Sequence, residues 1–164
     1  MPLRNKNKIQ SQASLRAIIR SLKKQGKRVV FTNGCFDIAH RGHVEYLKKA
    51  RAKGDILIVA VNGDRSVKKI KGPGRPLNSI ADRMAVLSAF EFVDYVTSFN
   101  EPTPLEIIKK LRPDVLIKGA DWKAKDIVGR GVVESLGGEV ATVSYRKGYS
   151  TTELIRRIGS LKKR

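Results

Sequence analysis

The stretch ILIVAVN, residues 56–62, is apolar at every position except the last. Strands that face solvent on one side alternate apolar and polar side chains, whereas strands covered by helices on both faces are apolar throughout. The stretch therefore predicts a central strand of a parallel sheet. Because parallel strands need a long crossover connection, usually a helix, helical segments are expected on either side of it.

Helical and strand patterns alternate along the rest of the chain. Residues 28–33 (RVVFTN) predict a strand before the central one, and later strands are predicted at 95–98, 115–118 and 139–143. Helices are expected from Leu15 to a stop at Gly26, over 43–53, from a cap at Ser79, from Thr103 to before Pro113, over 126–136 and from Ser150 through Ile158. Residues 63–78 are expected to form a basic loop.

These elements predict an α/β fold with a Rossmann-like, doubly wound, five-stranded parallel sheet and right-handed crossovers. We expect the strand order 3-2-1-4-5, in which the chain reverses direction between strands 1 and 4. Ligands of such sheets bind at the carboxyl ends of the strands beside this reversal. We therefore expect the functional site in the loops after strands 1 and 4, flanked by the loops after strands 2 and 5.

The chain of 164 residues predicts a single domain over 13–164, preceded by a basic, flexible tail over 1–12. No apolar stretch approaches the ~20 residues that a membrane span needs, and no apolar core of a secretory signal follows the basic N-terminus. The single cysteine, Cys35, excludes an internal disulfide. We therefore expect a cytoplasmic protein without membrane insertion.

The formal net charge of +19 lies mainly at the two ends of the chain. Residues 1–36 hold nine Lys and Arg residues and no acid, and residues 156–164 hold five more, again without an acid. The stretch 37–155 has 20 basic residues against 15 acids. Basic ends of this kind bind polyanions without specificity, through the release of counterions. They do not by themselves identify a nucleic-acid-binding protein.

Both histidines of the chain fall in the loop after the first strand, at the entry of a helix. His40 and His43 flank Gly42, and their spacing aims both rings at one point beyond the helix N-terminus, where backbone N–H groups favour an anion. Two alternatives remain open: surface or capping histidines, and a zinc site with Cys35, for which no fourth ligand is evident. The loop fits neither the Walker pattern nor G-x-G-x-x-G, which argues against a P-loop ATPase and a dinucleotide-dependent dehydrogenase.

The loops after the second and fourth strands carry charged and aromatic groups. Asp64 is followed by a basic run without an acid, which indicates either a solvated loop or a shaped lid over a polyphosphate. After the fourth strand, Lys118 offers a cation and Asp121 an acceptor for a sugar hydroxyl. Trp122 adds a flat ring that either faces a ligand or packs against the domain.

Three hydroxyl side chains, Ser150, Thr151 and Thr152, follow the fifth strand at a helix start, where they suit an anion or simply cap the helix. Together the four loops suit transfer at a nucleotide α-phosphate. In that reaction an acceptor oxygen attacks phosphorus in line while pyrophosphate leaves, which requires positioning and positive charge. An acceptor that is itself a phosphate monoester is already anionic, so it requires no general base.

The motifs of the chain, taken in order, resemble a known family. HRGH (40–43) is similar to the signature of the H-x-G-H nucleotidyltransferase superfamily. From about residue 29 to 158 the chain resembles the D-glycero-β-D-manno-heptose 1-phosphate adenylyltransferases, through TNGCFD (32–37), AVNGD (60–64), KGPGRP (71–76), DRMAVL (82–87), KGADW (118–122) and GYSTT (148–152). The resemblance implies a homodimer that converts ATP and heptose 1-phosphate, with Mg²⁺, to ADP-heptose and pyrophosphate for bacterial lipopolysaccharide. Many relatives carry a fused sugar kinase domain, so here a separate kinase is expected to supply the sugar phosphate.

The resemblance also implies the roles of particular residues. The expected catalytic residues are His40, His43 and Lys71. The expected nucleotide-binding residues are Thr32, Asn33, Gly34, Cys35, Phe36, Gly42, Asp64, Arg75, Lys118, Gly119, Ser150, Thr151 and Thr152. The expected residues for the sugar phosphate are Lys68, Asp121 and Trp122. No metal ligands are assigned.

Two other functions fit parts of the sequence. The related glycerol 3-phosphate cytidylyltransferases carry R-T-E-G-I-S-T-T where this chain has YRKGYSTT (145–152). The leading arginine is Tyr145 here and Arg146 has no assigned role, so this departure weakens the case for a cytidylyltransferase. A basic nucleic-acid-binding domain, the other alternative, would bind polyanions whether or not His40 and His43 were present.

Overall fold

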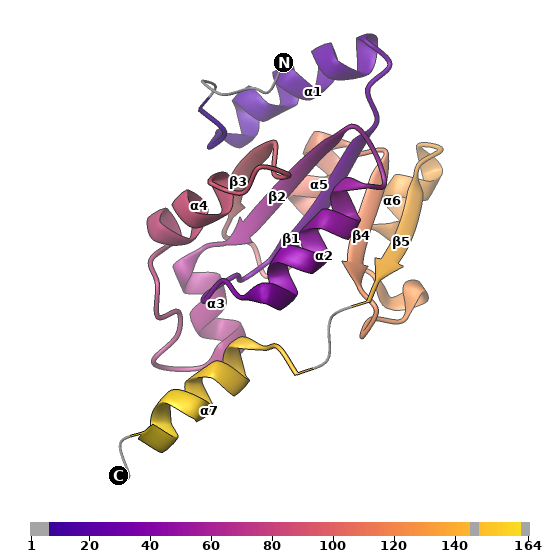
Figure 1. Cartoon of the computed structure of the whole chain (residues 1–164). Helices are drawn as coiled ribbons and strands as arrows, with labels where there is room; N and C mark the ends of the chain where they lie inside the picture. The colour runs from indigo at the N-terminus through magenta and orange to yellow at the C-terminus, as the bar shows by residue number, and fades with distance from the viewer. Residues whose placement is uncertain (1–6, 145–147, 162–164) are drawn as a thin grey trace.

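A computed structural model describes residues 7–144 and 148–161 (Figure 1). Its centre is one sheet of five parallel strands: β1 (Val29–Gly34), β2 (Ile56–Asn62), β3 (Tyr95–Phe99), β4 (Val115–Gly119) and β5 (Glu139–Val143). The strand order is β3-β2-β1-β4-β5. The predicted fold class and strand order are therefore confirmed.

Strand β2 lies inside the sheet, as its composition predicts. All seven of its residues are buried. Strand β1 pairs with it from Val29↔Ile56 to Gly34↔Val61, and β3 pairs with it on the other side. Helices cover both faces of this strand, so apolar side chains are buried on both, which is why residues 56–61 do not alternate with polar ones.

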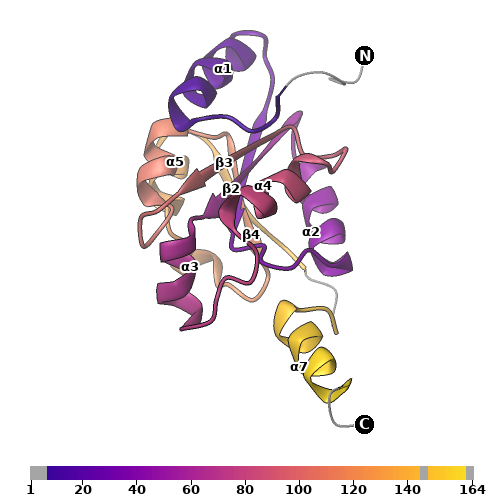
Figure 2. The same ribbon diagram turned by 90° about the vertical axis from the view of Figure 1, so that its left-hand side faces the viewer.

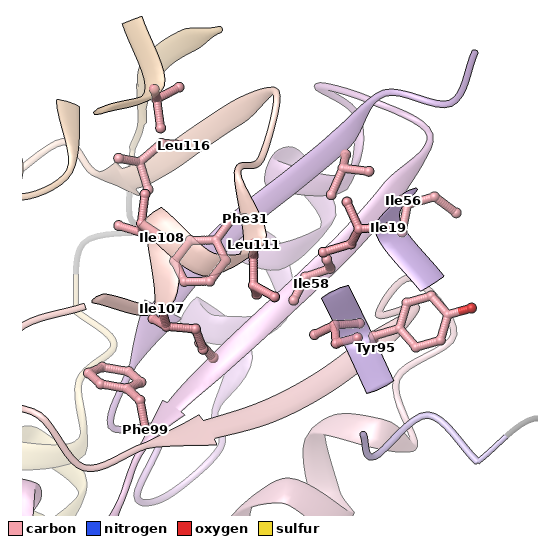
Figure 3. Packing of buried hydrophobic residues seen from close by; sticks show 14 of the residues in the cluster. Ile19, Phe31, Ile56, Ile58, Tyr95, Phe99, Ile107, Ile108, Leu111 and Leu116 are labelled. Carbon is pink, nitrogen blue, oxygen red and sulfur yellow. The ribbon is translucent and has the colours of Figure 1, made fainter. Parts of the chain in front are cut away.

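Helices cover both faces of the sheet, as the two views show (Figures 1 and 2). They are α1 (Gln12–Lys24), α2 (Arg41–Arg51), α3 (Asp64–Lys71), α4 (Ile80–Ser88), α5 (Leu105–Leu111), α6 (Arg130–Ser135) and α7 (Thr151–Leu161), with a 3-10 turn η1 (Ala124–Asp126). On one face, Ile19 of α1 and Ile108 of α5 join the cluster around Phe31 and Ile58 (Figure 3). On the other face, α2 and α4 close a second cluster. No helix in the described parts of the chain is long and apolar enough to cross a membrane.

The helix boundaries follow local signals in the sequence. Ser79 accepts a hydrogen bond from the backbone N–H of Asp82, so the predicted cap opens α4 as expected. Helix α5 ends at Leu111, and Arg112 adopts a left-handed φ of 49° just before Pro113. Proline disfavours helical geometry in the residue that precedes it, which explains the stop.

The basic stretch after β2 differs from the prediction, because residues 64–71 form helix α3. The helix forms because one of its faces packs inward. Val67 is fully buried, and Ser66 accepts a hydrogen bond from the Asn62 side chain at 3.1 Å, while Lys68 and Lys69 remain exposed. Only residues 72–79 remain as a connecting loop, so the expected basic loop over 63–78 is wrong in its first half.

The predicted helix over 126–136 is also interrupted. Residues 124–126 form the 3-10 turn η1, and α6 begins only at Arg130. Gly129 separates them with a φ of +91°, and a Cβ placed there would lie 2.5 Å from Cδ1 of Ile108. The close approach of α5 therefore breaks the helix that the side-chain periodicity predicts.

The segment that was expected to be a flexible tail, 1–12, is described from residue 7 onward. The backbone N–H of Gln10 donates to the carbonyl of Val96, and the N–H of Val96 donates to the carbonyl of Lys8, both at 2.9 Å. Ile9 forms an isolated parallel bridge with Val96. Residues 8–10 are therefore attached to the edge strand β3, because its outer backbone groups would otherwise be unpaired.

Candidate active site

A cavity of about 730 Å³ opens at the carboxyl ends of the strands, beside the reversal between β1 and β4. In Figure 1 these strand ends point toward α7. Most of the predicted site residues line the cavity: Asn33, Gly34, Cys35, Phe36, His40, His43, Lys71, Arg75, Lys118, Gly119, Asp121, Trp122, Ser150, Thr151 and Thr152. The fold therefore brings four segments that are distant in the sequence to one cavity of the size that small ligands occupy.

His40 and His43 form one unit in this cavity. Their rings are stacked, with centroids 3.8 Å apart and planes inclined by 23°. His40 is the N-cap residue of α2, and its carbonyl accepts a hydrogen bond from the backbone N–H of His43 at 2.9 Å. The Phe36 ring lies against His43 with its centroid at 5.1 Å. Both imidazoles and the N-terminus of α2 therefore meet at one wall of the cavity, as their spacing predicts.

The histidines are neutral in the folded protein at neutral pH. Burial lowers the pKa of His40, and burial together with the neighbouring His40 ring lowers the pKa of His43 to about 4. A neutral imidazole retains one N–H donor and one acceptor nitrogen, so the pair offers directed hydrogen bonds without carrying charge.

Three buried polar atoms around the cavity have no hydrogen-bond partner among the described residues: Oδ1 of Asn33, Nδ1 of His40 and Nδ1 of His43. Unpaired buried polar groups are rare in folded proteins, because each costs free energy. All three atoms belong to residues that line the cavity.

The two alternative interpretations of the histidines find no support in the described structure. His40 occupies the N-cap position of α2, but its side chain makes no capping hydrogen bond. Within residues 7–144 and 148–161, no group of three or more His, Cys, Asp or Glu side chains is placed to hold a metal ion.

Lys118 and Trp122 form the β4 wall of the cavity. Nζ of Lys118 lies 5.5 Å from the Trp122 ring centroid, within range of a cation–π interaction. Burial lowers the pKa of Lys118 to about 8, while Asp121 and Cys35 act in the opposite direction. The Trp122 side chain remains 46% exposed, so the residue is not packed into the core.

The pH dependence of turnover should reveal Lys118. Lys118 is expected to contact phosphate in its charged form, which exists below a pKa of about 8, so kcat/KM of a phosphate-transfer reaction should fall as the pH rises through that value. Lys118→Arg retains its charge, and the alkaline limb should move upward in this variant. The pH profile, and not the absolute rate, is the measurement. Lys109→Arg, an exposed control on α5, should retain the wild-type profile, and an identical alkaline limb in all three proteins would contradict the assignment.

A buried carboxylate fixes the loop that carries Arg75. Both Asp37 oxygens accept hydrogen bonds from the backbone N–H of Leu77, and one also accepts from Asn78, at 2.8–2.9 Å. Nε of Arg75 donates to the same carboxylate at 2.6 Å. Burial acts to raise the pKa of Asp37, but the hydrogen bonds from Asn78, Leu77 and Arg75 outweigh it and hold the pKa below its ordinary value. Loop 72–79 is therefore an ordered wall of the cavity.

Four predicted site residues do not line the cavity. Thr32 is fully buried, and its hydroxyl lies 2.7 Å from that of Tyr46. Gly42 lies under the His40 ring, Asp64 pairs with Arg83, and Lys68 is exposed on α3. These positions support the walls of the site or face away from it.

Helix α7 contributes only its first turn to the cavity. Ser150 accepts a hydrogen bond from the N–H of Glu153, and the Thr151 hydroxyl donates to the carbonyl of Ile38 at 3.4 Å. No residue of α7 is buried, and the helix projects from the rest of the chain in both views (Figures 1 and 2). Ser150 therefore caps the helix as the pattern predicts, while Tyr145 and Arg146, where the chain departs from the cytidylyltransferase pattern, lie outside the described residues.

The sequence did not single out several residues that shape the site. Asp37 and Arg83 lie inside the motifs TNGCFD and DRMAVL, but nothing in their spacing shows that both are buried. The loop after β3 adds Pro102, Thr103 and Pro104 to the cavity wall. Because the carboxyl ends of all parallel strands meet at one edge, this fifth loop could have been included at the outset.

The fold, the paired histidines and the surrounding cations define a nucleotidyltransferase. Residues 31–157 match the cytidylyltransferase-like family, and the chain belongs to this family of enzymes. The family resemblance carried by the sequence motifs is thereby confirmed.

Two relatives are similar to this chain over nearly its whole length. The chain is 49% identical over 150 residues to the bifunctional protein HldE of Alcanivorax borkumensis, covering 92% of this chain and 32% of that protein. It is 50% identical over 157 residues to the bifunctional protein HldE of Geotalea uraniireducens, covering 94% of this chain and 32% of that one. The chain thus spans about a third of the length of these relatives.

Two solved structures share the fold. A lipopolysaccharide core biosynthesis protein from Thermoplasma volcanium superposes with a TM-score of 0.62 at 29% identity, over 76% of this chain and all of that one. Pantoate-β-alanine ligase from Francisella tularensis superposes with a TM-score of 0.58 at 15% identity, over 95% of this chain and 79% of that one. At this identity the second likeness concerns the fold alone.

Proposed function

We propose that this chain transfers the adenylyl group of ATP to D-glycero-β-D-manno-heptose 1-phosphate, giving ADP-heptose and pyrophosphate. Three findings support the proposal: the six motifs in order, the identity to HldE proteins, and the likeness to a protein of lipopolysaccharide core biosynthesis. ADP-heptose would then be consumed in the assembly of that polysaccharide.

The observation that carries the proposal is the stacked histidine pair at the N-terminus of α2. Neutral rings 3.8 Å apart, set at the N-terminus of a helix, can donate hydrogen bonds to the nonbridging oxygens of one phosphoryl group. Such donors stabilise the charge that develops on these oxygens as the acceptor attacks. A covalent nucleophile is not required.

The reaction proceeds by in-line displacement. A phosphate oxygen of the sugar 1-phosphate forms a bond to the α-phosphorus of ATP while the bond from phosphorus to the bridging oxygen breaks, and the electron pair leaves with pyrophosphate. Lys71 and Arg75, on the wall formed by α3 and loop 72–79, would balance part of the charge on the leaving group. Lys118 would act similarly from the β4 wall.

Mg²⁺ fits this site as an ion that arrives on the triphosphate. Asp37 and Asp121 are the carboxylates among the described residues that line the cavity, and Asp37 is already occupied by Arg75 and two backbone N–H groups. Magnesium typically binds one or two carboxylates together with substrate phosphates and water. Asp121 would be its protein ligand, and the ion would add positive charge to the phosphates when bound.

The direct test is a matrix of two nucleotides and two acceptors. Pyrophosphate release is measured with ATP or CTP against heptose 1-phosphate or glycerol 3-phosphate. The proposal predicts turnover with ATP and heptose 1-phosphate that exceeds every other combination. A preference for CTP and glycerol 3-phosphate would instead establish the cytidylyltransferase that the family description also allows.

Trp122 provides a test of where the sugar phosphate binds. It is the single tryptophan of the chain and lines the cavity, so its fluorescence reports on this wall alone. Sugar phosphate should change the emission saturably, and Trp122→Ala should raise the KM for sugar phosphate about fivefold, since the lost ring contact is worth roughly 1 kcal/mol. The KM for ATP should change less. An equal rise in both KM values would contradict this placement of the acceptor.

A further inference from the structure

Arg83 is a buried cation outside the cavity. Its side chain has no exposed surface, and its guanidinium donates hydrogen bonds to three acceptors from three segments. Nη1 donates to the carbonyl of Cys35 at 2.6 Å, Nη2 to Oδ1 of Asp64 at 2.7 Å, and Nε to the carbonyl of Asn78 at 3.1 Å. Helix α4 is thereby tied to the β1–α2 loop, to the start of α3 and to loop 72–79.

This arrangement does more than neutralise a charge. Asp64 is 45% exposed, so the ion pair alone could form at the surface without burying the arginine. A buried charge is costly unless it is fully paired, and the planar guanidinium fork matches several acceptors in fixed directions. The two carbonyl acceptors belong to two segments that contribute residues to the cavity lining: the β1–α2 loop, before the histidines, and loop 72–79, after Arg75.

The backbone beside Cys35 needs such support. Phe36 adopts a left-handed φ of 48°, which is unfavourable for a residue with a bulky side chain. Strained residues of this kind persist only when their surroundings fix them, and they occur preferentially at functional sites. Arg83 holds the carbonyl on one side of Phe36, and Asp37 on the other side is held by loop 72–79. The Phe36 ring in turn packs against His43.

We propose that Arg83 is a positioning residue for nucleotidyl transfer, which fixes Cys35 and Phe36 so that the His40–His43 pair is held in place to meet the reacting phosphate. The role rests on the proposed function for its kinetic consequence. It acts through the β1–α2 loop, because Arg83 itself does not line the cavity.

The test is Arg83→Lys, which keeps the positive charge and loses the fork. We expect kcat to fall about 10- to 100-fold, the usual effect of a misplaced catalytic group, with the KM values changed less than kcat. The second readout is the alkylation rate of Cys35 by iodoacetamide, which is specific because the chain has one cysteine. That rate should rise several-fold, and the rise cannot come from a lost charge. Arg28→Lys, an exposed pair with Glu139 at the opposite end of the sheet, is the matched control and should change neither readout.

Each outcome decides the proposal. Wild-type kcat in a folded Arg83→Lys protein, or a loss of kcat without faster alkylation of Cys35, would overturn it. If Arg83→Lys does not fold, Asp64→Asn removes only the negative charge of the ion pair. This variant should shift both readouts in the same direction by a smaller factor, and the absence of any shift would overturn the proposal. If wild-type protein shows no turnover, the proposed function fails, while the alkylation rates still decide whether Arg83 fixes this loop.

Discussion

Replacing His40 or His43 by alanine is expected to lower kcat about 100-fold or more, the usual loss for a removed transition-state donor. Both rings face one phosphate in the proposed reaction, and their centroids are 3.8 Å apart. Because they act as a unit, the double variant should lose little more than the more damaging single variant. Single-turnover measurements with saturating ATP and sugar phosphate would separate this loss from weakened binding.

Folding and polyanion binding supply the controls for this prediction. Both imidazoles are neutral in the folded protein, and neither Nδ1 has a hydrogen-bond partner among the described residues, so alanine at either position removes ring packing but no ion pair. The thermal midpoint should therefore fall by no more than a few degrees. Binding of a nucleic acid through the basic ends should be the same in wild type and variants. Unchanged turnover in both single variants would contradict the proposed role of the pair.

The sheet could be predicted because its determinants are local. Residues 56–62 are apolar on both faces, which fixes β2 as an inner strand, and serine or proline at single positions fixes the ends of α4 and α5. The order of the strands was expected as one typical of doubly wound sheets with right-handed crossovers. The cavity followed in turn from the reversal between β1 and β4.

The supports of the site could not be predicted because they depend on long-range contacts. Arg83 reaches Cys35 across 48 positions, and Asp37 reaches Arg75 across 38, and no periodicity joins such pairs. Thr32 illustrates a second reason why a predicted site residue can lie outside the cavity. Neighbouring strand residues point to opposite faces, so of Thr32 and Asn33 only one can face the cavity, and the other packs beside Tyr46. A family motif names both positions without separating their orientations.

Gly42→Ala is expected to lower kcat/KM about 10- to 100-fold without unfolding the protein. The glycine has an ordinary helical backbone, so the expected effect is steric: the new Cβ would collide with neighbouring side chains. A Cβ at this position would lie 2.9 Å from both Cε1 and Nδ1 of His40 and 3.1 Å from Cβ of Tyr149. The imidazole must therefore rotate away, which separates it from His43 and disturbs the contact with the loop that precedes α7. Steady-state kinetics with thermal unfolding would measure both consequences.

Gly131→Ala is the matched control, because it makes the same substitution within α6 with no atom within 4 Å of the new Cβ. Alanine is the better helix former there by roughly 0.5–1 kcal/mol, so this variant should be slightly more stable and equally active. The comparison removes the general effect of a glycine-to-alanine change in a helix. If Gly42→Ala retained the activity of Gly131→Ala, the His40 ring would not need the position that the structure gives it, and the role assigned to the stacked pair would have to be abandoned.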